Sequence, residues 1–395
     1  MRTRLLAIAG LIGLVVAPLA AAPSAGAGPV KPGKPLTVMT RNIYLGADIN
    51  RPVNAAAITQ AQGGSPQEIL VALANATHVT RTNVDRTDFP TRAGLLADEV
   101  AEHRPDLIGL QEVALWRSGP VPELDKVGVP NATTVDYDYL EILLDALTAR
   151  GLAYEAVAVG ERADVEAPSF TGSPFAGTMA NARDVRMTMR DVILMRSDKG
   201  LQVTASGDQI FEHNLVVPIA GVVMRFDRGY HWVDVRAGAT SLRFVNSHFE
   251  AFSSDIALAQ ASEVLADAPS AEDATVFVCD CNSDPLDDRV KTGIGDTQPH
   301  KAPYDLITGP GGFTDQWLEW APAEAGWTSG LSELVKDTSA AGFDHRIDMV
   351  FARTPHGVLA VDRGAVTGTD LTDRDPATGL WPSDHGGVVL RLRGF

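Results

Sequence analysis

Residues 279–282, with the sequence Cys-Asp-Cys-Asn, place a carboxylate and a carboxamide at the end of an apolar segment. The preceding run 274–278 is rich in β-branched residues, and 283–285 is a turn signal, so the pattern predicts a buried strand over 274–281. Side chains alternate along a strand, so Asp280 and Asn282 are expected to share one face. Burying these polar groups is costly without a partner, which predicts a site for a metal ion, water or phosphate.

Other polar side chains follow or open apolar strand patterns elsewhere in the chain. If the ends of these strands meet at one edge of the fold, the polar side chains can converge on a single site. They are Asn42 after 37–40, Glu112 after 107–110, Asn246 and His248 after 244–245, Asp348 within 346–350, and Asp384 with His385 just before 386–389.

These residue types suit a hard metal ion. Carboxylates such as Glu112 and Asp384 are oxygen ligands of the kind that Mg²⁺ or Mn²⁺ prefers. The chain has no His-x-x-x-His helix and no paired thiolates beyond its two cysteines, which argues against zinc.

The remaining groups suit a phosphate ester. The amides of Asn42 and Asn282 can donate to phosphate oxygens without adding charge. The histidines can hydrogen-bond a phosphoryl oxygen that gains charge in the transition state, and a carboxylate beside a histidine fixes its tautomer. The residue types therefore predict metal-assisted hydrolysis of a phosphoester.

The order of these motifs resembles the endonuclease/exonuclease/phosphatase superfamily, which includes deoxyribonucleases, apurinic endonucleases, bacterial sphingomyelinases and inositol polyphosphate 5-phosphatases. The resemblance runs from about residue 36 to the C-terminus, with a variable stretch near 114–190. It implies an α/β fold, a four-layer sandwich of two packed mixed β-sheets flanked by helices. The matching motifs are Thr40-Arg41-Asn42, Leu110-Gln111-Glu112-Val113, Val245-Asn246-Ser247-His248-Phe249, Gln260-Ala261, Cys279-Asp280-Cys281-Asn282, Arg346-Ile347-Asp348 and Ser383-Asp384-His385.

The resemblance also implies a role for each residue. The metal, Mg²⁺ or Mn²⁺, would be held mainly by Glu112, with Asn42 and Asp384 near it. The catalytic set would comprise Asp280 to orient or deprotonate the attacking water, Asn282 and His248 to bind phosphoryl oxygens, and His385, held by Asp348, for acid–base or electrostatic catalysis.

Two departures from the family pattern matter. The usual Gly-Asp-Phe-Asn is Cys-Asp-Cys-Asn at 279–282, so the spacer residues differ while both chemical residues remain. Apurinic endonucleases tend to carry an acid where this chain has Tyr44, and a tyrosine where it has His248. Both differences point away from that branch.

The two cysteines lie two positions apart on the predicted strand. Their Cα atoms would then be about 6.5–7 Å apart, at or past the upper limit of disulfide geometry. Cys279 and Cys281 are therefore predicted to be buried thiols. A soft-metal site is the alternative, but it would need ligands that the sequence does not offer.

The N-terminus has the pattern of a secretory signal peptide over residues 1–27, followed by a flexible Pro/Gly-rich leader over 28–35 and a catalytic domain over 36–395. The alternative, a membrane anchor, needs a longer apolar run, and no other segment could span a bilayer. The sequence thus predicts a secreted protein.

The mature protein is strongly acidic. Removing Arg2 and Arg4 with the signal peptide changes the net charge from −17 to −17 − 2 = −19. This charge disfavours a nonspecific nucleic-acid binder.

Strand patterns outnumber helix patterns and often follow one another directly, which favours mixed sheets. Residues 50–90 are expected to be less regular. Helices are predicted at 91–102, 139–150 and 255–265, and strands at 36–40, 107–110, 191–195, 221–226, 232–235, 242–245, 274–281, 347–351 and 388–392.

The expected partner is a phosphodiester substrate, which could be a lipid headgroup, a small molecule or a nucleic acid. Export and acidity favour a phospholipid or small phosphodiester, as in sphingomyelinases or phospholipases C. The alternatives are a secreted nuclease and a non-catalytic binding protein on the same fold. No obligate protein partner is evident.

Two further groups of residues could bind a substrate. The sequence favours a solvated face paired with acids, rather than a phosphate site, for Arg183, Arg186 and Arg190. The tryptophans at 317, 320 and 327 are predicted to be core residues or a contact for a membrane or for bases.

Overall fold

The computed structural model describes residues 34–121, 129–219, 222–238, 240–270, 272–292, 295–355 and 359–394. The predicted signal peptide and the leader as far as residue 33 lie outside these residues and stay predictions. In the described part of the chain, no helix combines the length and the apolar character that a membrane span requires.

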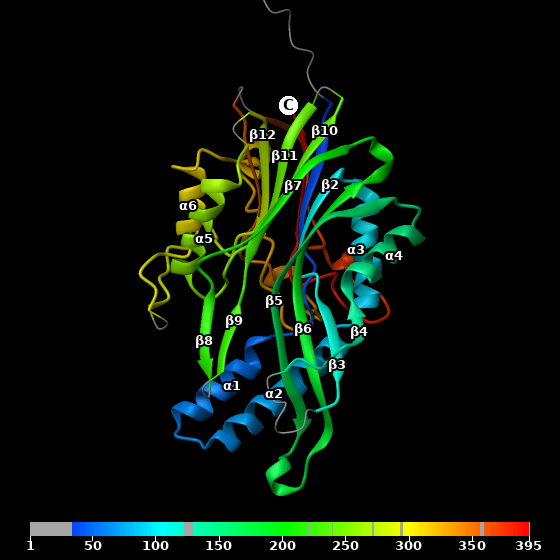
Figure 1. Ribbon diagram of the computed structural model, residues 1–395. Coiled ribbons are helices and arrows are strands. Elements are labelled where there is room, and N and C mark those ends of the chain that lie inside the picture. Colours follow the sequence, from blue (N-terminus) through cyan, green and yellow to red (C-terminus); the bar gives the residue numbers. More distant parts are fainter. Residues whose placement is uncertain are drawn as a thin grey trace, which may run out of the picture. The chain divides into compact units, whose positions relative to one another are not determined.

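Two large sheets pack against each other (Figure 1). Each mixes parallel and antiparallel neighbours: β1 is parallel to β2 in one sheet, and β11 is parallel to β12 in the other. The eight-stranded sheet has the order β15 (Ala360–Thr367), β16 (Gly387–Arg393), β1 (Leu36–Asn42), β2 (Leu107–Gln111), β6 (Ala180–Arg196), β3 (Leu115–Gly119) and β4 (Thr134–Asp138), with β5 (Tyr154–Thr171) also paired to β6. The six-stranded sheet has the order β13 (Thr314–Asp315), β14 (Asp348–Arg353), β12 (Ala274–Asp280), β11 (Thr240–His248), β10 (Gly229–Ala237) and β7 (Gln202–Ile210). A separate hairpin is formed by β8 (Leu215–Ile219) and β9 (Val222–Phe226).

The helices cover the outer faces of the two sheets. On the eight-stranded sheet, α3 (Phe89–His103) and α4 (Tyr139–Ala149) share one hydrophobic core with β2 and β6. On the six-stranded sheet, α5 (Ser254–Asp267) packs on β11, β12 and β14, with α6 (Ala302–Thr308) beside it (Figure 1). The short helix α7 (Gln316–Trp320) packs against β14 and β15. The predicted four-layer α/β sandwich is confirmed.

The inner faces of the sheets meet in a core of branched and aromatic side chains, with Val38 and Ile193 from one sheet and Val276 and Val350 from the other. Gly109 lies in this interface. A Cβ atom there would lie 2.4 Å from Val278 Cγ2, so only glycine lets the two sheets approach so closely at this point.

The prediction of irregular structure for residues 50–90 is wrong. Two helices occupy most of this region, α1 (Asn50–Ala61) and α2 (Pro66–Arg86), and α2 packs against β5. The buried face of α2 includes Thr77, Thr80, Arg81 and Asn83, so the apolar stripe by which an amphipathic helix is recognised is interrupted. A sequence signal was nevertheless present, because Ser65 and Glu68 form a capping box with proline at the first helical position.

The prediction of two buried thiols is also wrong, because Cys279 and Cys281 form a disulfide. The strand β12 ends at Asp280, and the chain then turns, with Asn282 at a φ of 44°. The turn brings the two Cα atoms to 5.0 Å, within the range that a disulfide spans, whereas a continuous strand would hold them further apart. Both residues are buried, as expected, beneath α5.

We expect a thiol assay on denatured, unreduced protein to find no free thiol, and to find two after reduction. A disulfide that closes so short a loop should add about 1.5 kcal/mol to the free energy of unfolding in the chain-entropy model. Urea unfolding of a Cys279→Ala/Cys281→Ala variant against the oxidised protein measures this difference. Two titratable thiols in the unreduced protein would contradict the bridge.

Candidate active site

The catalytic residues predicted from sequence lie at one end of the two sheets, at matching positions on neighbouring strands. In the six-stranded sheet, His248 at the end of β11 is opposite Asp280, and Asp280 is opposite Asp348 at the start of β14. The eight-stranded sheet brings Asn42 at the end of β1, and His385 just before β16. The expected convergence of strand ends is therefore observed for these five residues, whereas the Asn246 side chain bonds Gln111 and the Leu110 carbonyl between the sheets.

Asp280 is the centre of this cluster. Its Oδ2 atom accepts a hydrogen bond from Asn42 Nδ2 at 2.9 Å, and lies 3.4 Å from His248 Nε2 and 3.9 Å from His385 Nε2. Its Oδ1 atom accepts from the backbone N–H of Asn282 at 3.1 Å. Burial raises the pKa of Asp280 to about 7; His385 opposes the rise and Asp348 adds to it. A carboxyl group with such a pKa can exchange a proton near neutral pH.

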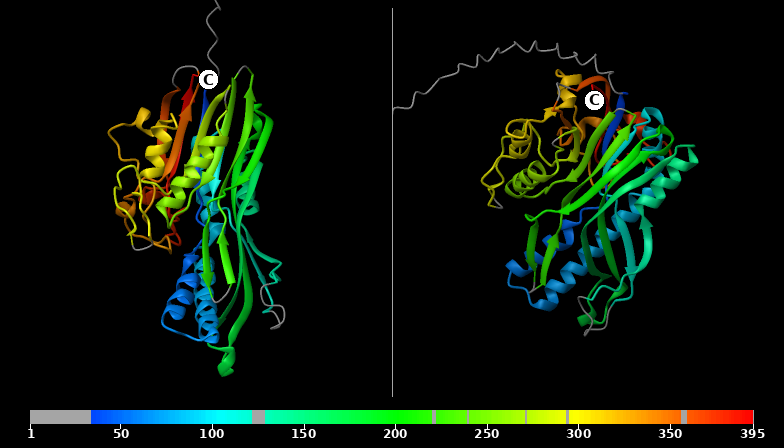
Figure 2. Two further views of the ribbon diagram at one scale, coloured as in Figure 1. Left: turned by 60° about the vertical axis from the view of Figure 1, so that its left-hand side comes forward. Right: turned by 45° about the horizontal axis from the view of Figure 1, so that its top comes forward.

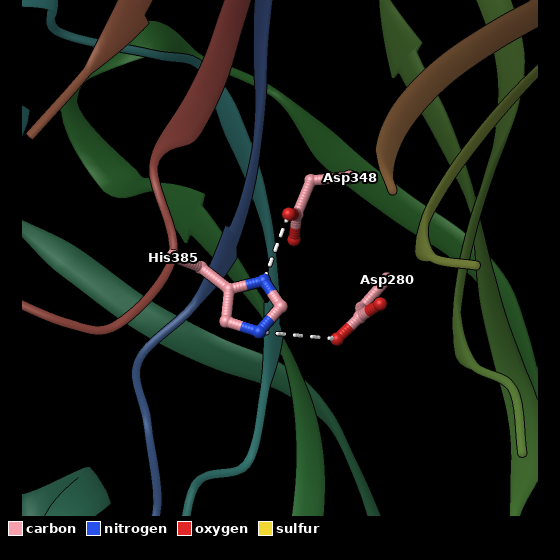
Figure 3. Close-up of side chains that lie close together, drawn as sticks. All are labelled: Asp280, Asp348 and His385. Carbon is pink, nitrogen blue, oxygen red and sulfur yellow. Dashed lines mark hydrogen bonds and ion pairs between the residues drawn. The ribbon is translucent and has the colours of Figure 1, made fainter. Parts of the chain in front are cut away.

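His385 and Asp348 form a base–orienter pair (Figure 3). His385 Nδ1 lies 2.8 Å from Asp348 Oδ2, and its other ring nitrogen faces Asp280. Burial alone would lower the pKa of His385, but the carboxylates of Asp348, Asp280 and Asp384 raise it well above its usual value. His385 is therefore an imidazolium at neutral pH.

His248 has the opposite character. Burial lowers its pKa well below the usual value, and the positive charges of Arg228 and His385 lower it further. Two histidines, one neutral and one charged, thus face the same carboxylate of Asp280. Environments that push neighbouring pKa values apart are a mark of acid–base sites.

Glu112 and Asp384 are the two carboxylates that the sequence assigns to the metal. Burial raises the pKa of Asp384 to about 6, His385 opposes this, and the Glu112 carboxylate raises it further, so the two carboxylates lie close enough to repel. Glu112 Oε2 accepts from the Leu45 backbone N–H at 2.9 Å. A hard divalent ion would relieve the repulsion, as the sequence predicts.

A second group of side chains could also hold an ion. One ligand atom each from Asp280, Asp348 and His385 lies within 4.8 Å of the others, and Asp348 Oδ1 is buried without a hydrogen-bond partner in the described part of the chain. These are the residues that the sequence assigns to catalysis, so this group differs from the predicted ligands Glu112 and Asp384. His385 Nδ1 is already paired with Asp348, and a cationic imidazole has no free lone pair to offer a metal. Glu112 and Asp384 are therefore the better ligands.

Two predicted amides lie at the site with part of their hydrogen-bonding capacity already used. Asn42 Oδ1 accepts from the Tyr44 backbone N–H at 2.9 Å while its Nδ2 holds Asp280. Asn282 Nδ2 donates to the Phe249 carbonyl at 3.0 Å. Asn42 therefore positions Asp280, and Asn282 retains one amide hydrogen and its oxygen for a ligand.

The backbone at the site is in a sparsely populated conformation. Tyr44, Glu112 and Asn282, which follow β1, β2 and β12, have φ values of 59°, 59° and 44°. Non-glycine residues pay for such angles, and they persist where surrounding structure over-determines them, often at functional sites.

Buried arginines that the sequence analysis missed fix the loops of the site. Arg92 on α3 donates to the carbonyls of Ile43, Tyr44 and Pro382 at 2.7–3.0 Å. Arg41 donates to the His385 carbonyl and pairs with Glu99 at 2.9 Å. The sequence offered only a weak signal that Arg92 is buried. It lies on the apolar stripe of α3, four residues before the buried Leu96.

We expect Glu99→Gln to cost about 3 kcal/mol in the free energy of unfolding, because breaking a buried ion pair leaves Arg41 charged and uncompensated. Asp98→Asn is the matched control on the same helix. It breaks the exposed Asp98–Arg150 pair and should cost less than about 1 kcal/mol. Urea unfolding of both variants measures the difference, and equal costs would rule out a special role for the Arg41–Glu99 pair.

The other candidate residues lie as follows. Arg186 pairs with Asp164, as a face paired with acids predicts. The prediction of a solvated face is wrong for Arg190, which is buried and pairs with Asp138. Trp317 is buried, whereas the side chains of Trp320 and Trp327 are 40% and 47% exposed. The three tryptophans line an open groove of about 600 Å³ together with Phe343 and β15 residues.

Known proteins share this architecture. No family model matches the chain, and no curated protein matches it by sequence. By structure, the chain is similar to an endonuclease/exonuclease/phosphatase family protein from Bacteroides thetaiotaomicron, with a TM-score of 0.53 and 17% identity over 92% of this chain and 96% of that one. It is also similar to the mannosyl-6-phosphatase of Bacteroides thetaiotaomicron VPI-5482, with a TM-score of 0.51 and 18% identity over 90% and 99%. At these identities the similarity establishes the fold, and this chain has the fold of the endonuclease/exonuclease/phosphatase proteins.

Proposed function

We propose that this protein is a divalent-metal-dependent phosphodiester hydrolase. The observation that carries the proposal is the arrangement around Asp280: a carboxyl group with a pKa of about 7 lies between neutral His248 and cationic His385. Such a set can take a proton from water and stabilise negative charge at the same time.

The residues at the strand ends divide the work. Asp280 orients the attacking water and accepts its proton, since it is the only carboxylate of the site that contacts both histidines in the described structure. His385 offers positive charge to the phosphoryl group, and Asp348 holds its ring. His248 donates to a phosphoryl oxygen through Nε2, and Asn282 adds its remaining amide hydrogen.

Glu112 and Asp384 would hold the metal, Mg²⁺ or Mn²⁺, with Asn42 near it. A divalent ion bound there supplies Lewis-acid stabilisation of the phosphoryl oxygens and lowers the pKa of bound water. The carboxylate pair and its mutual repulsion support this assignment.

For the substrate, we propose a phospholipid or a small phosphodiester rather than a nucleic acid. The net charge of −17 offers little attraction to a polyanion. The tryptophan-lined groove supports an amphipathic substrate, since indole rings bind apolar groups with a polar edge. The groove and the site are linked along the chain, since Trp327 precedes Thr328, whose Oγ1 accepts from the backbone N–H of Asp348 at 3.2 Å.

We also propose that the protein is exported. The support is the basic start, apolar run and small-residue cleavage pattern of residues 1–27. N-terminal sequencing of protein recovered from the culture medium of a secreting host tests this. A start near residue 23 or 28 is expected, and retention of the full-length chain in the cell would reject export.

The function is tested by assaying purified protein on sphingomyelin, inositol phosphates and plasmid DNA, with EDTA or graded Mg²⁺. Hydrolysis should require the metal, and Glu112→Gln should raise the Mg²⁺ concentration needed for half-maximal rate at least about tenfold, because one charged ligand is lost. Glu319→Gln, on α7, is the control and should behave as wild type. Cleavage of DNA alone would reject the lipid preference, and metal-independent or absent hydrolysis on every substrate would favour a binding protein.

A further inference from the structure

Arg228 lies against the side of His248 that faces away from Asp280. Its Nη1 atom is 2.6 Å from His248 Nδ1 and 3.2 Å from Met189 Sδ. The backbone of Arg228 is fixed as well, because its N–H donates to Asn214 Oδ1 at 2.8 Å and its carbonyl accepts from the Phe211 N–H at 2.9 Å. The guanidinium is therefore held in place, and both side chains are buried.

The chemistry of this contact determines where the proton of His248 lies. A guanidinium has only N–H donors and no acceptor, so His248 Nδ1 must present its lone pair to Arg228. In a neutral imidazole the proton then sits on Nε2. That nitrogen points to Asp280, 3.4 Å from Oδ2, toward the centre of the cluster.

We propose that Arg228 is a positioning residue that fixes His248 as the neutral Nε2–H tautomer. In this form His248 is a hydrogen-bond donor toward the reacting phosphoryl oxygen and has no free nitrogen to act as a base. The tautomer follows from the geometry of the contact between Arg228 and His248, whereas its role in hydrolysis rests on the function proposed above.

The electrostatic setting of Arg228 supports this role. In the described ranges, Arg228 forms no ion pair with a carboxylate, although its side chain is almost fully buried. A buried cation whose nearest counter-charge, Asp191, acts only from beyond ion-pair distance is costly, and is retained where it serves a ligand or a neighbour. It also opposes a second positive charge on His248, so the ring stays neutral beside cationic His385.

The tautomer can be read directly by NMR of protein labelled with ¹⁵N-histidine, without any substrate. The signals of His248 are assigned by their loss in His248→Gln. Wild type should show a single neutral form with the proton on Nε2. Arg228→Lys keeps a donor-only group of similar reach and should keep this form. Arg228→Met has similar length but no donor, so Nδ1 becomes free to take a proton and the single form should be lost.

Activity gives a second readout. Arg228→Met should lower kcat/KM by about 10²-fold, the cost of misplacing one donor to a developing anion, while Arg228→Lys recovers most of the activity. Arg225→Met, which removes an exposed arginine of β9, should match wild type in both measurements. Urea unfolding of each variant shows whether it is folded.

Three results would overturn the proposal: a proton on Nδ1 in wild type, an imidazolium at neutral pH, or an unchanged His248 spectrum in folded Arg228→Met. In the last case a fall in activity would come from the charge of Arg228 alone. If instead the protein hydrolyses no phosphoester, the proposed function fails while the NMR result still decides the tautomer.

Discussion

Asp280→Asn is expected to lower kcat about 10³- to 10⁴-fold, because the carboxylate that accepts the proton of the attacking water is lost. The substitution keeps the shape of the side chain but replaces one acceptor oxygen with an amide. That amide would meet either Asn42 Nδ2 or the Asn282 N–H, both of which are donors to Asp280. The measurement is single-turnover hydrolysis of the substrate identified in the panel.

At pH 8 in EDTA the same substitution removes the cost of ionising a buried carboxyl group, which offsets part of the cost of placing an amide against a donor. Burial raises the pKa of Asp280 from an ordinary value near 4 to about 7, so the folded state disfavours the ionised form. The sign follows from linkage: stability falls as pH rises from about 4 to about 7, and a neutral Asn removes this penalty. A fall in activity that far exceeds any fall in stability distinguishes a functional residue from a structural one.

Asp234→Asn is the matched control for Asp280→Asn. Asp234 lies on β10 of the same sheet, well along the strands from the site, and pairs with Arg243. Its substitution should not change the rate. A wild-type rate in folded Asp280→Asn would contradict the assignment of Asp280 as the general base.

The sandwich could be predicted from the sequence because its central strands are short, apolar and end in polar residues. The runs before Asn42, Glu112, His248 and Asp280 all form strands as expected, and their polar ends meet. In parallel neighbours such as β1–β2 and β11–β12, carboxyl ends lie at the same edge, so pattern alone locates the site.

The strand β5, the outer half of β6 and the helix α2 were not predictable by the same rule, since apolar and polar residues do not alternate regularly along them. β5 and β6 run side by side for most of their length (Figure 2). Their outward faces are held by charged pairs such as Asp164–Arg186, so the alternation of apolar and polar residues is lost. The buried face of α2 is largely polar, so the capping box at its N-terminus was the clearest sequence signal for this helix.

The electrostatic character of the site also lay beyond the sequence. Nothing in the motif around His248 places an arginine beside it, because Arg228 comes from the segment between β9 and β10. The opposite charge states of His248 and His385 follow from their neighbours: a guanidinium on one, three carboxylates around the other. The disulfide likewise depends on where β12 ends, which spacing alone did not give.

Asp348→Asn is expected to lower kcat about 10³- to 10⁴-fold, the scale seen when a histidine loses the carboxylate that orients it. Asp348 Oδ2 holds His385 Nδ1 at 2.8 Å, and its charge is the first of the three that raise the pKa of His385. An amide at this position can donate to Nδ1 and so favour the wrong tautomer.

The pH profile shows whether Asp348 acts through His385 rather than through the fold. The carboxylates around His385 raise its pKa, so His385 stays cationic to high pH and its deprotonation sets the descending, alkaline limb of the rate profile. In Asp348→Asn the pKa of His385 falls, and the descending limb of the rate profile should move to lower pH. Asp315→Asn is the control, since it breaks another buried ion pair, with Arg346, and should lower stability without moving the limb. If Asp348→Asn lowered the rate equally at every pH, the carboxylate would be needed for something other than the charge of His385, and the direct candidate would be the metal group formed by Asp280, Asp348 and His385.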